Sequence, residues 1–174
     1  MLVIVRGLPG SGKTYLAQQD YPGHLLLEGD QYYMTDTNKY EFGEGMLKSS
    51  SEYVKMMLAT ALSTGIKSVV ITTTSPDGKR ALEYASIAKG FGHKTKFVWI
   101  DFENGNTNQN RHGLPASVIE KMKEDWREIP HEIKIERVRA SDMFVADQCK
   151  HVVRKESPEW FRSLQAMRES KNVS

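Results

Sequence analysis

The stretch GLPGSGKT, residues 7–14, decides the fold of this chain because it satisfies the pattern G-x-x-x-x-G-K-[ST] at every fixed position. The apolar run LVIV at residues 2–5 indicates a buried strand before it, and KTYLAQQD at residues 13–20 indicates a helix after it. Glycines in such a turn let several backbone N–H groups point at one phosphate chain, and the helix adds the positive end of its dipole. The sequence therefore predicts a loop that binds nucleotide phosphates.

Two side chains of this loop have expected roles in the chemistry. Lys13 supplies a mobile positive charge for the β- and γ-phosphates, and the Thr14 hydroxyl is a candidate ligand of Mg²⁺. The residues expected to contact the nucleotide, ATP, are Gly7, Pro9, Gly10, Ser11, Gly12, Lys13, Thr14 and Tyr15.

The bulk composition is typical of one globular domain. The 174 residues are too few for two ordinary domains. The net charge is +2 and the charges are evenly spread along the chain, which excludes a basic tail without deciding on nucleic acid. Cys149 is the single cysteine, so an internal disulfide is excluded, and the apolar run at residues 2–5 is too short for a signal peptide or a membrane span. We expect a cytoplasmic protein without a membrane partner.

Apolar runs and helical patterns alternate along the chain. Strands are expected at residues 2–5, 24–27, 68–72, 95–102 and 132–138, and helices at 13–20, 46–62, 79–90, 116–128 and 158–169, with a loop at 31–45. Strands that alternate with helices favour an α/β fold, with a mostly parallel sheet between helices on both faces. We expect a single domain over residues 1–174.

Asp30 is a candidate catalytic base. It follows the second expected strand, at the carboxyl edge of the sheet, where ligands of open α/β folds gather. A carboxylate there can accept the proton of an acceptor hydroxyl as the γ-phosphoryl arrives, although a solvated turn at residues 28–30 explains the position equally well. The guanine-reading pattern N-K-x-D is absent, which favours a kinase over a GTPase.

Four segments together resemble the polynucleotide kinase-like P-loop kinases, such as the kinase domain of bacteriophage polynucleotide kinase and its stand-alone relatives. They are the phosphate loop, GDQYY at residues 29–33, the apolar strand at 69–71 and NRHGLPASVIEKMKEDW at 110–126. The resemblance covers residues 1–128, and residues 129–174 would be an extension that completes or flanks the sheet.

The resemblance implies a three-layer P-loop kinase fold and a 5′-hydroxyl kinase that uses ATP and Mg²⁺. The acceptor would be an end of DNA or RNA, or a nucleotide. By the resemblance, Asp30 is the general base and Arg111 lies over the transferring phosphoryl, where a guanidinium matches the charge that spreads over its oxygens.

The chain departs from the family pattern near the acceptor. Tyr33 stands where relatives often carry an arginine, and Gln109 stands where they may carry a second lid arginine. Tyr32 and Tyr33 could stack on a nucleobase or pack on the core. These departures keep two alternatives open, a kinase of a hydroxymethylated DNA base and a kinase of a small alcohol or nucleoside.

A second departure concerns the metal. Relatives read Asp-x-Thr-Asn after the third strand, whereas this chain reads TTTS at residues 72–75. Thr72, Thr73 and Thr74 could hold a metal-bound water or touch the acceptor, and Asp101 is another candidate for the missing acid. Without that acid, a nucleotide-binding module that transfers no phosphoryl group is a further alternative.

Overall fold

The computed structural model describes residues 1–34, 46–101 and 114–135, which all lie in one compact unit, Met1–Val138. The helix expected at 158–169 and most of the predicted C-terminal extension fall outside these residues. Both, and the expected single domain over 1–174, stay predictions.

The strands of the described residues form one parallel sheet in the order β2-β3-β1-β4-β5. Their bounds are β1 Leu2–Arg6, β2 Leu25–Glu28, β3 Val69–Thr73, β4 Thr95–Ile100 and β5 Ile133–Ile135. All residues of β1 and β3 are buried, as in the central strands of parallel sheets whose two faces are covered. The expected parallel sheet is confirmed.

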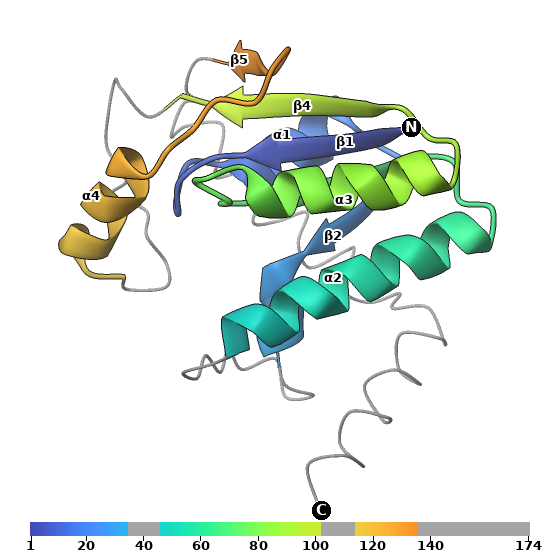
Figure 1. The fold of residues 1–174 in the computed structure, drawn as a ribbon, viewed down its shortest axis with the longest axis horizontal. Coiled ribbons are helices and arrows are strands. Elements are labelled where there is room, and N and C mark those ends of the chain that lie inside the picture. Colours follow the sequence, from blue (N-terminus) through green and yellow to red (C-terminus); the bar gives the residue numbers. More distant parts are fainter. Residues whose placement is uncertain (35–45, 102–113, 136–174) are drawn as a thin grey trace, which may run out of the picture. The chain divides into compact units, whose positions relative to one another are not determined.

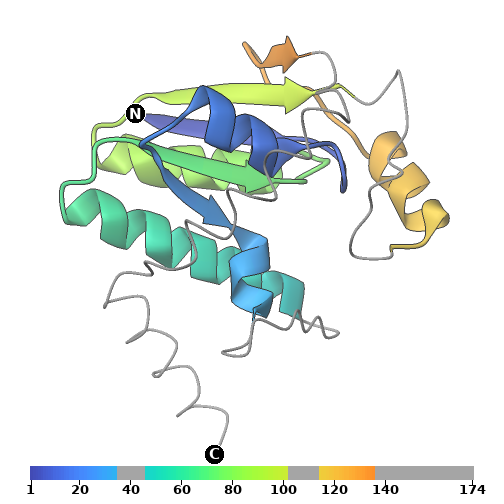
Figure 2. The ribbon, with the colours of Figure 1, turned by 180° about the vertical axis from the view of Figure 1, so that it is seen from behind.

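Helices cover both faces of the sheet, which confirms the three-layer α/β fold. Helix α1, Lys13–Asp20, lies on one face, and helices α2, Met46–Ser63, and α3, Lys79–Gly90, lie on the other (Figures 1 and 2). Helix α4, Ala116–Glu124, ends four residues before its expected boundary. None of the helices in these described parts is long and apolar enough to cross a membrane.

Alternate side chains of the strands build the core. On the α1 side, strand and helix residues form one buried cluster, which consists of Val3, Val5, Leu16, Ala17, Val70, Val98 and Ile100. On the other face, Trp99 of β4 packs with Leu8, Ile119 and Trp126, and this second cluster attaches α4 and the segment after it. The phosphate loop is thus anchored by Leu8 in the second cluster, and α1 is anchored by Leu16 and Ala17 in the first.

The loop expected from residue 31 is wrong at its start, because residues Gly29–Tyr33 form a short 3₁₀ helix, η1. The cause is a capping box that the sequence analysis missed. The Glu28 side chain accepts the backbone N–H of Gln31, and the Gln31 side chain accepts the Glu28 N–H at 3.3 Å. The cap fixes the direction in which the chain leaves β2.

Candidate nucleotide and metal site

The phosphate loop has the backbone that its glycines predict. Gly10 and Gly12 have φ angles of 77° and 90°, in the left-handed region that other residues avoid. A Cβ on Gly7 would lie 2.4 Å from Ser11 Oγ, so a side chain there would force the Ser11 hydroxyl to move. Helix α1 begins directly afterwards, and Gly12 gives its first turn no side-chain cap. The first N–H groups of α1 are therefore available to an anion.

Lys13 lies within this loop and its Nζ donates a hydrogen bond to the Leu8 carbonyl oxygen at 2.8 Å. Burial lowers the pKa of Lys13 to about 8, although the charges of Asp30 and Glu28 oppose that shift. Both carboxylates therefore act on the amino group that is expected to meet the β- and γ-phosphates.

Glu28 is the site residue that the sequence analysis missed. Its Oε1 accepts a hydrogen bond from Thr14 Oγ1 at 2.5 Å and another from Thr72 Oγ1 at 2.8 Å. Strand register explains the meeting, because Glu28 of β2 and Val5 of β1 both pair with Thr72 of β3. Only the order of the strands reveals that Glu28 meets Thr14 and Thr72. The sequence held one local clue to Glu28, which is the capping signal in the EGDQ stretch at 28–31.

The oxygen atoms gathered here fit a magnesium ion. Mg²⁺ prefers carboxylate and hydroxyl oxygens, keeps several waters, and needs few protein ligands beside the nucleotide phosphates. Thr14 and Glu28 supply such oxygens directly behind the phosphate loop, with Thr72 beside them. The Thr14 assignment made from the sequence stays a prediction, now with a carboxylate in contact.

Asp30 lies in η1 and is exposed, two residues beyond Glu28. It follows the end of β2 at the carboxyl edge of the sheet, and its charge opposes the lowering of the Lys13 pKa. Its role as general base stays a prediction.

The two expected acceptor tyrosines differ in burial. Tyr33 is 4% exposed, and its hydroxyl lies 2.9 Å from Ser50 Oγ of α2. This burial supports core packing rather than base stacking for Tyr33. Tyr32 is only partly buried, with its ring centroid 5.7 Å from those of both Tyr33 and Tyr53.

The threonines at the end of β3 are mostly covered. Thr72 and Thr73 are 6% and 8% exposed, and Thr74 is half-buried. The Thr72 hydroxyl donates a hydrogen bond to Glu28, so Thr72 is the poorest candidate of the three threonines for contacting the acceptor. Thr73 and Thr74 stay candidates.

Asp101 follows β4, on the side of β1 that is away from β3. Its carboxylate forms an ion pair with Lys134 of β5 at 3.1 Å. Because Thr14 meets Glu28 on the opposite side, Asp101 is the poorer candidate for the missing acid.

The other predicted residues are placed as follows. Pro9 is buried in the phosphate loop and Tyr15 is half-buried in α1. Arg111 and Gln109 lie outside the described residues, so the lid arginine stays a prediction.

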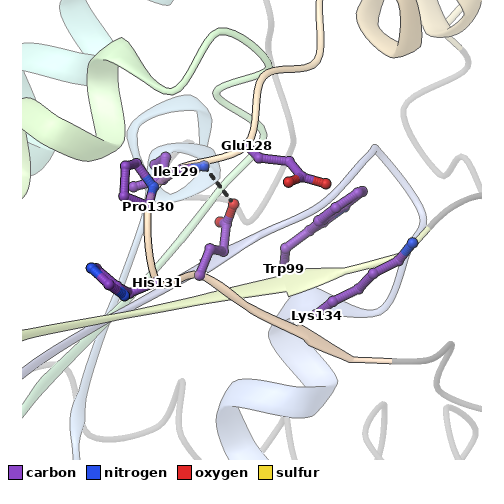
Figure 3. Close-up of a pocket in the computed structure, with 7 residues that line it drawn as sticks. Trp99, Glu128, Ile129, Pro130, His131 and Lys134 are labelled. Carbon is purple, nitrogen blue, oxygen red and sulfur yellow. Dashed lines mark hydrogen bonds between the residues drawn. The ribbon is translucent and has the colours of Figure 1, made fainter.

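A separate hollow of about 540 Å³ lies where the segment before β5 passes β4 (Figure 3). Trp99 and Lys134 line it, and the Ile129 N–H donates to Glu132 Oε2 at 3.2 Å beside it. None of the residues predicted for the site line this hollow.

Comparison with known proteins gave no matching family model. A curated relative is NEDD4-binding protein 2 of Homo sapiens, which is 27% identical over 135 residues. That match covers 73% of this chain and 8% of the relative, so the chain spans only a small part of that protein.

Several of the solved structures with the same fold are P-loop kinases. A gluconokinase from Sinorhizobium meliloti 1021 has a TM-score of 0.56 at 15% identity, and 92% of this chain and 96% of that one are covered. For the APS kinase CysC of Mycobacterium tuberculosis the TM-score is 0.53 at 14% identity, with coverages of 87% and 94%. A chain of the Pnkp1/Rnl/Hen1 RNA repair complex has a TM-score of 0.57 at 17% identity, with coverages of 71% and 43%. The chain therefore has the α/β fold that these P-loop kinases share.

Proposed function

We propose that this chain is an ATP-dependent phosphotransferase that moves the γ-phosphoryl group to a hydroxyl of a nucleic acid or nucleotide, with a 5′-hydroxyl end as the leading acceptor. The observation that carries the proposal is that the phosphate loop, which follows β1, and the exposed Asp30, which follows β2, both lie at the carboxyl edge of one parallel sheet. Lys13 belongs to that loop, and the charge of Asp30 opposes the lowering of its pKa. This is the arrangement that in-line transfer to a hydroxyl needs.

The residues of the chain divide the reaction between them. Lys13 and the N–H groups of the phosphate loop hold the β- and γ-phosphates. Asp30 accepts the proton of the acceptor hydroxyl while that oxygen bonds to the γ-phosphorus and the bond to the β-phosphate oxygen breaks, releasing ADP. Arg111 is proposed to lie over the transferring phosphoryl group and balance its charge. Magnesium, when bound, neutralises negative charge on the phosphates.

Glu28 favours a catalyst over a nucleotide-binding module. The module alternative rests on the missing acid at the end of β3, and a carboxylate contacts that strand end from β2. The hydroxymethylated-base alternative rests on Tyr33 and Gln109, and the burial of Tyr33 weakens it.

The acceptor class rests on the family resemblance and on the RNA repair complex among the structures with this fold. The gluconokinase, which matches over nearly the whole of both chains, keeps a small alcohol as the second candidate. A panel of 5′-hydroxyl DNA, 5′-hydroxyl RNA, hydroxymethylpyrimidine DNA, nucleosides and gluconate, each with labelled ATP, separates these acceptors.

The direct test is transfer of labelled γ-phosphate from MgATP to a 5′-hydroxyl oligonucleotide. The wild-type chain should label it, and Asp30→Asn should lower the rate by about 100-fold or more, because the amide cannot accept the proton. Asp77→Asn removes another carboxylate, half exposed in the turn before α3, and should label at the wild-type rate.

Two results would count against the proposal. Labelling by Asp30→Asn at the wild-type rate would remove Asp30 as the base. Tight binding of ATP without transfer to any member of the panel would favour the binding module instead.

A further inference from the structure

The ends of β2 and β3 lie side by side, and only one of them carries an acid. Strand β3 ends in Thr72 and Thr73, while Glu28 is the last residue of β2 and pairs directly with Thr72. Neighbouring strands of a sheet are about 4.8 Å apart. The carboxylate of Glu28 can therefore reach the place that the carboxylate of an acidic residue at position 72 would occupy.

The contacts of Glu28 point its carboxylate toward the phosphate loop. Thr14 and Thr72 donate to the same oxygen, at 2.5 and 2.8 Å, and the Gln31 N–H donates to the side chain as well. Donors from α1, β3 and η1 thus fix one carboxylate. The Thr14 hydroxyl donates its hydrogen bond to Glu28, which leaves the lone pairs of the Thr14 oxygen for a cation.

In phosphate-loop enzymes the metal of the nucleotide is held by the loop Ser/Thr and by an acid at the end of a neighbouring strand. We propose that Glu28 provides that acid from β2, and that it holds the magnesium of MgATP together with Thr14 while Thr72 positions its carboxylate. The inference rests on the proposed function, since it concerns the same nucleotide. Asp101 is the poorer candidate for this role, because it follows β4 on the other side of β1 and pairs with Lys134.

A purely structural role for Glu28, as the cap of η1, predicts different behaviour. The cap needs an acceptor oxygen, which glutamine retains, whereas a metal ligand needs the negative charge. Glu28→Gln therefore removes the charge and keeps one acceptor oxygen, whose two lone pairs can serve two of the three donors. A metal role predicts a loss of metal affinity from this substitution, and a purely structural role predicts none.

The experiment measures binding of fluorescent ADP with magnesium and with EDTA, and binding of Mn²⁺ to the protein–ADP complex by electron paramagnetic resonance. For Glu28→Gln we expect the Mn²⁺ affinity of the complex to fall by about 10- to 100-fold. The affinity for ADP in EDTA should stay the same or rise, because a negative charge near the phosphates is removed.

A relocated acid provides the rescue. In Glu28→Gln/Thr72→Asp the carboxylate moves to the end of β3, and we expect the Mn²⁺ affinity to recover by at least about 10-fold. Glu83→Gln, which removes an exposed carboxylate on α3, should bind Mn²⁺ like the wild type. Asp30→Asn should also bind Mn²⁺ like the wild type, although it should lose phosphoryl transfer. The two results together distinguish the metal role of Glu28 from the base role of Asp30.

Wild-type Mn²⁺ affinity in Glu28→Gln would overturn the inference and leave the proposed function standing. A second outcome is that Glu28→Gln loses Mn²⁺ affinity while the wild-type chain phosphorylates no acceptor. That outcome would support the inference and remove the proposed function. If the wild-type chain binds no metal with ADP, both are overturned.

Discussion

At Lys13, burial and the neighbouring carboxylates act in opposite directions on one pKa. Burial lowers it to about 8, against the charges of Asp30 and Glu28. An unfolded lysine titrates near 10.4, so between these two values the unfolded chain holds more protons than the folded one. The free energy of unfolding should therefore rise with pH across that window, as the cost of a buried charge is relieved.

The same lysine predicts proton uptake when nucleotide binds. Phosphate oxygens favour the charged amine, so ADP raises the pKa of Lys13 and the complex takes up protons at pH near 8.5. Calorimetry in buffers of different ionisation enthalpy measures this uptake. Lys13→Arg keeps a permanent charge and should bind without that uptake. Equal binding heats for the wild type in all buffers at that pH would contradict the assigned pKa.

At the scale of the elements, the phosphate loop was predictable because its signal is local. Eight consecutive residues, 7–14, specify the turn, and the strand and helix beside it confirm the context. Glu28 was missed because its contact with Thr72 joins residues 44 positions apart, and only the order of the strands brings them together. Periodicity locates strands in the sequence, but it does not state which strands are neighbours.

The turn before α3 shows how one glycine joins two elements. Gly78 is the N-cap residue directly before α3 and has a φ of 74°, and a Cβ there would lie 3.2 Å from Ile129 Cγ1. Ile129 follows α4 and is 5% exposed, so it has little room to move. A side chain at residue 78 would be strained in its backbone and crowded by its neighbour.

Gly78→Ala should therefore lower the free energy of unfolding by about 1–3 kcal/mol, measured by urea denaturation. Gly65→Ala is the matched control, because Gly65 has a φ of 88° and nothing within 4 Å of its Cβ position. The smaller loss expected for Gly65→Ala reports the backbone strain alone. Equal losses would mean that Ile129 gives way without cost.

At the scale of the compact unit, a buried arginine joins segments that are far apart in the sequence. Arg6, the last residue of β1, is 0% exposed and forms an ion pair with Glu132 at 2.7 Å. Its guanidinium also donates to the Ser75, Pro76 and Arg127 carbonyl oxygens and lies 4.5 Å from the Trp126 ring centroid. The phosphate loop starts at the next residue, so this network supports the loop from behind.

This network was outside the reach of the sequence. A charged residue at the end of an apolar run normally marks the point where burial stops, and the strand expected at residues 2–5 ends before Arg6. Burial is possible because Glu132 and several carbonyl oxygens gather around the guanidinium, and they come from segments more than 60 residues away. Charge pairing of this kind depends on the completed fold.

Removing the arginine should leave Glu132 buried and uncompensated. We expect Arg6→Met to lower the free energy of unfolding by about 3–5 kcal/mol at pH near 7, and Arg6→Met/Glu132→Leu to recover much of that loss. Lys121→Met, which breaks an exposed pair with Asp125, should change stability by less than about 1 kcal/mol.

The pH dependence of that loss gives a second measurement. Burial raises the pKa of Glu132 above its ordinary value, against the charge of Arg6, so the folded chain holds this proton more tightly than the unfolded one. Without Arg6 the pKa rises further, and the unfolding free energy should then fall more steeply as pH rises from the ordinary glutamate value. Urea denaturation of Arg6→Met should therefore show a smaller loss at pH near 5 than near 7. A loss of equal size at both pH values would mean that Glu132 finds another partner, and that the arginine contributes through packing on Trp126 instead.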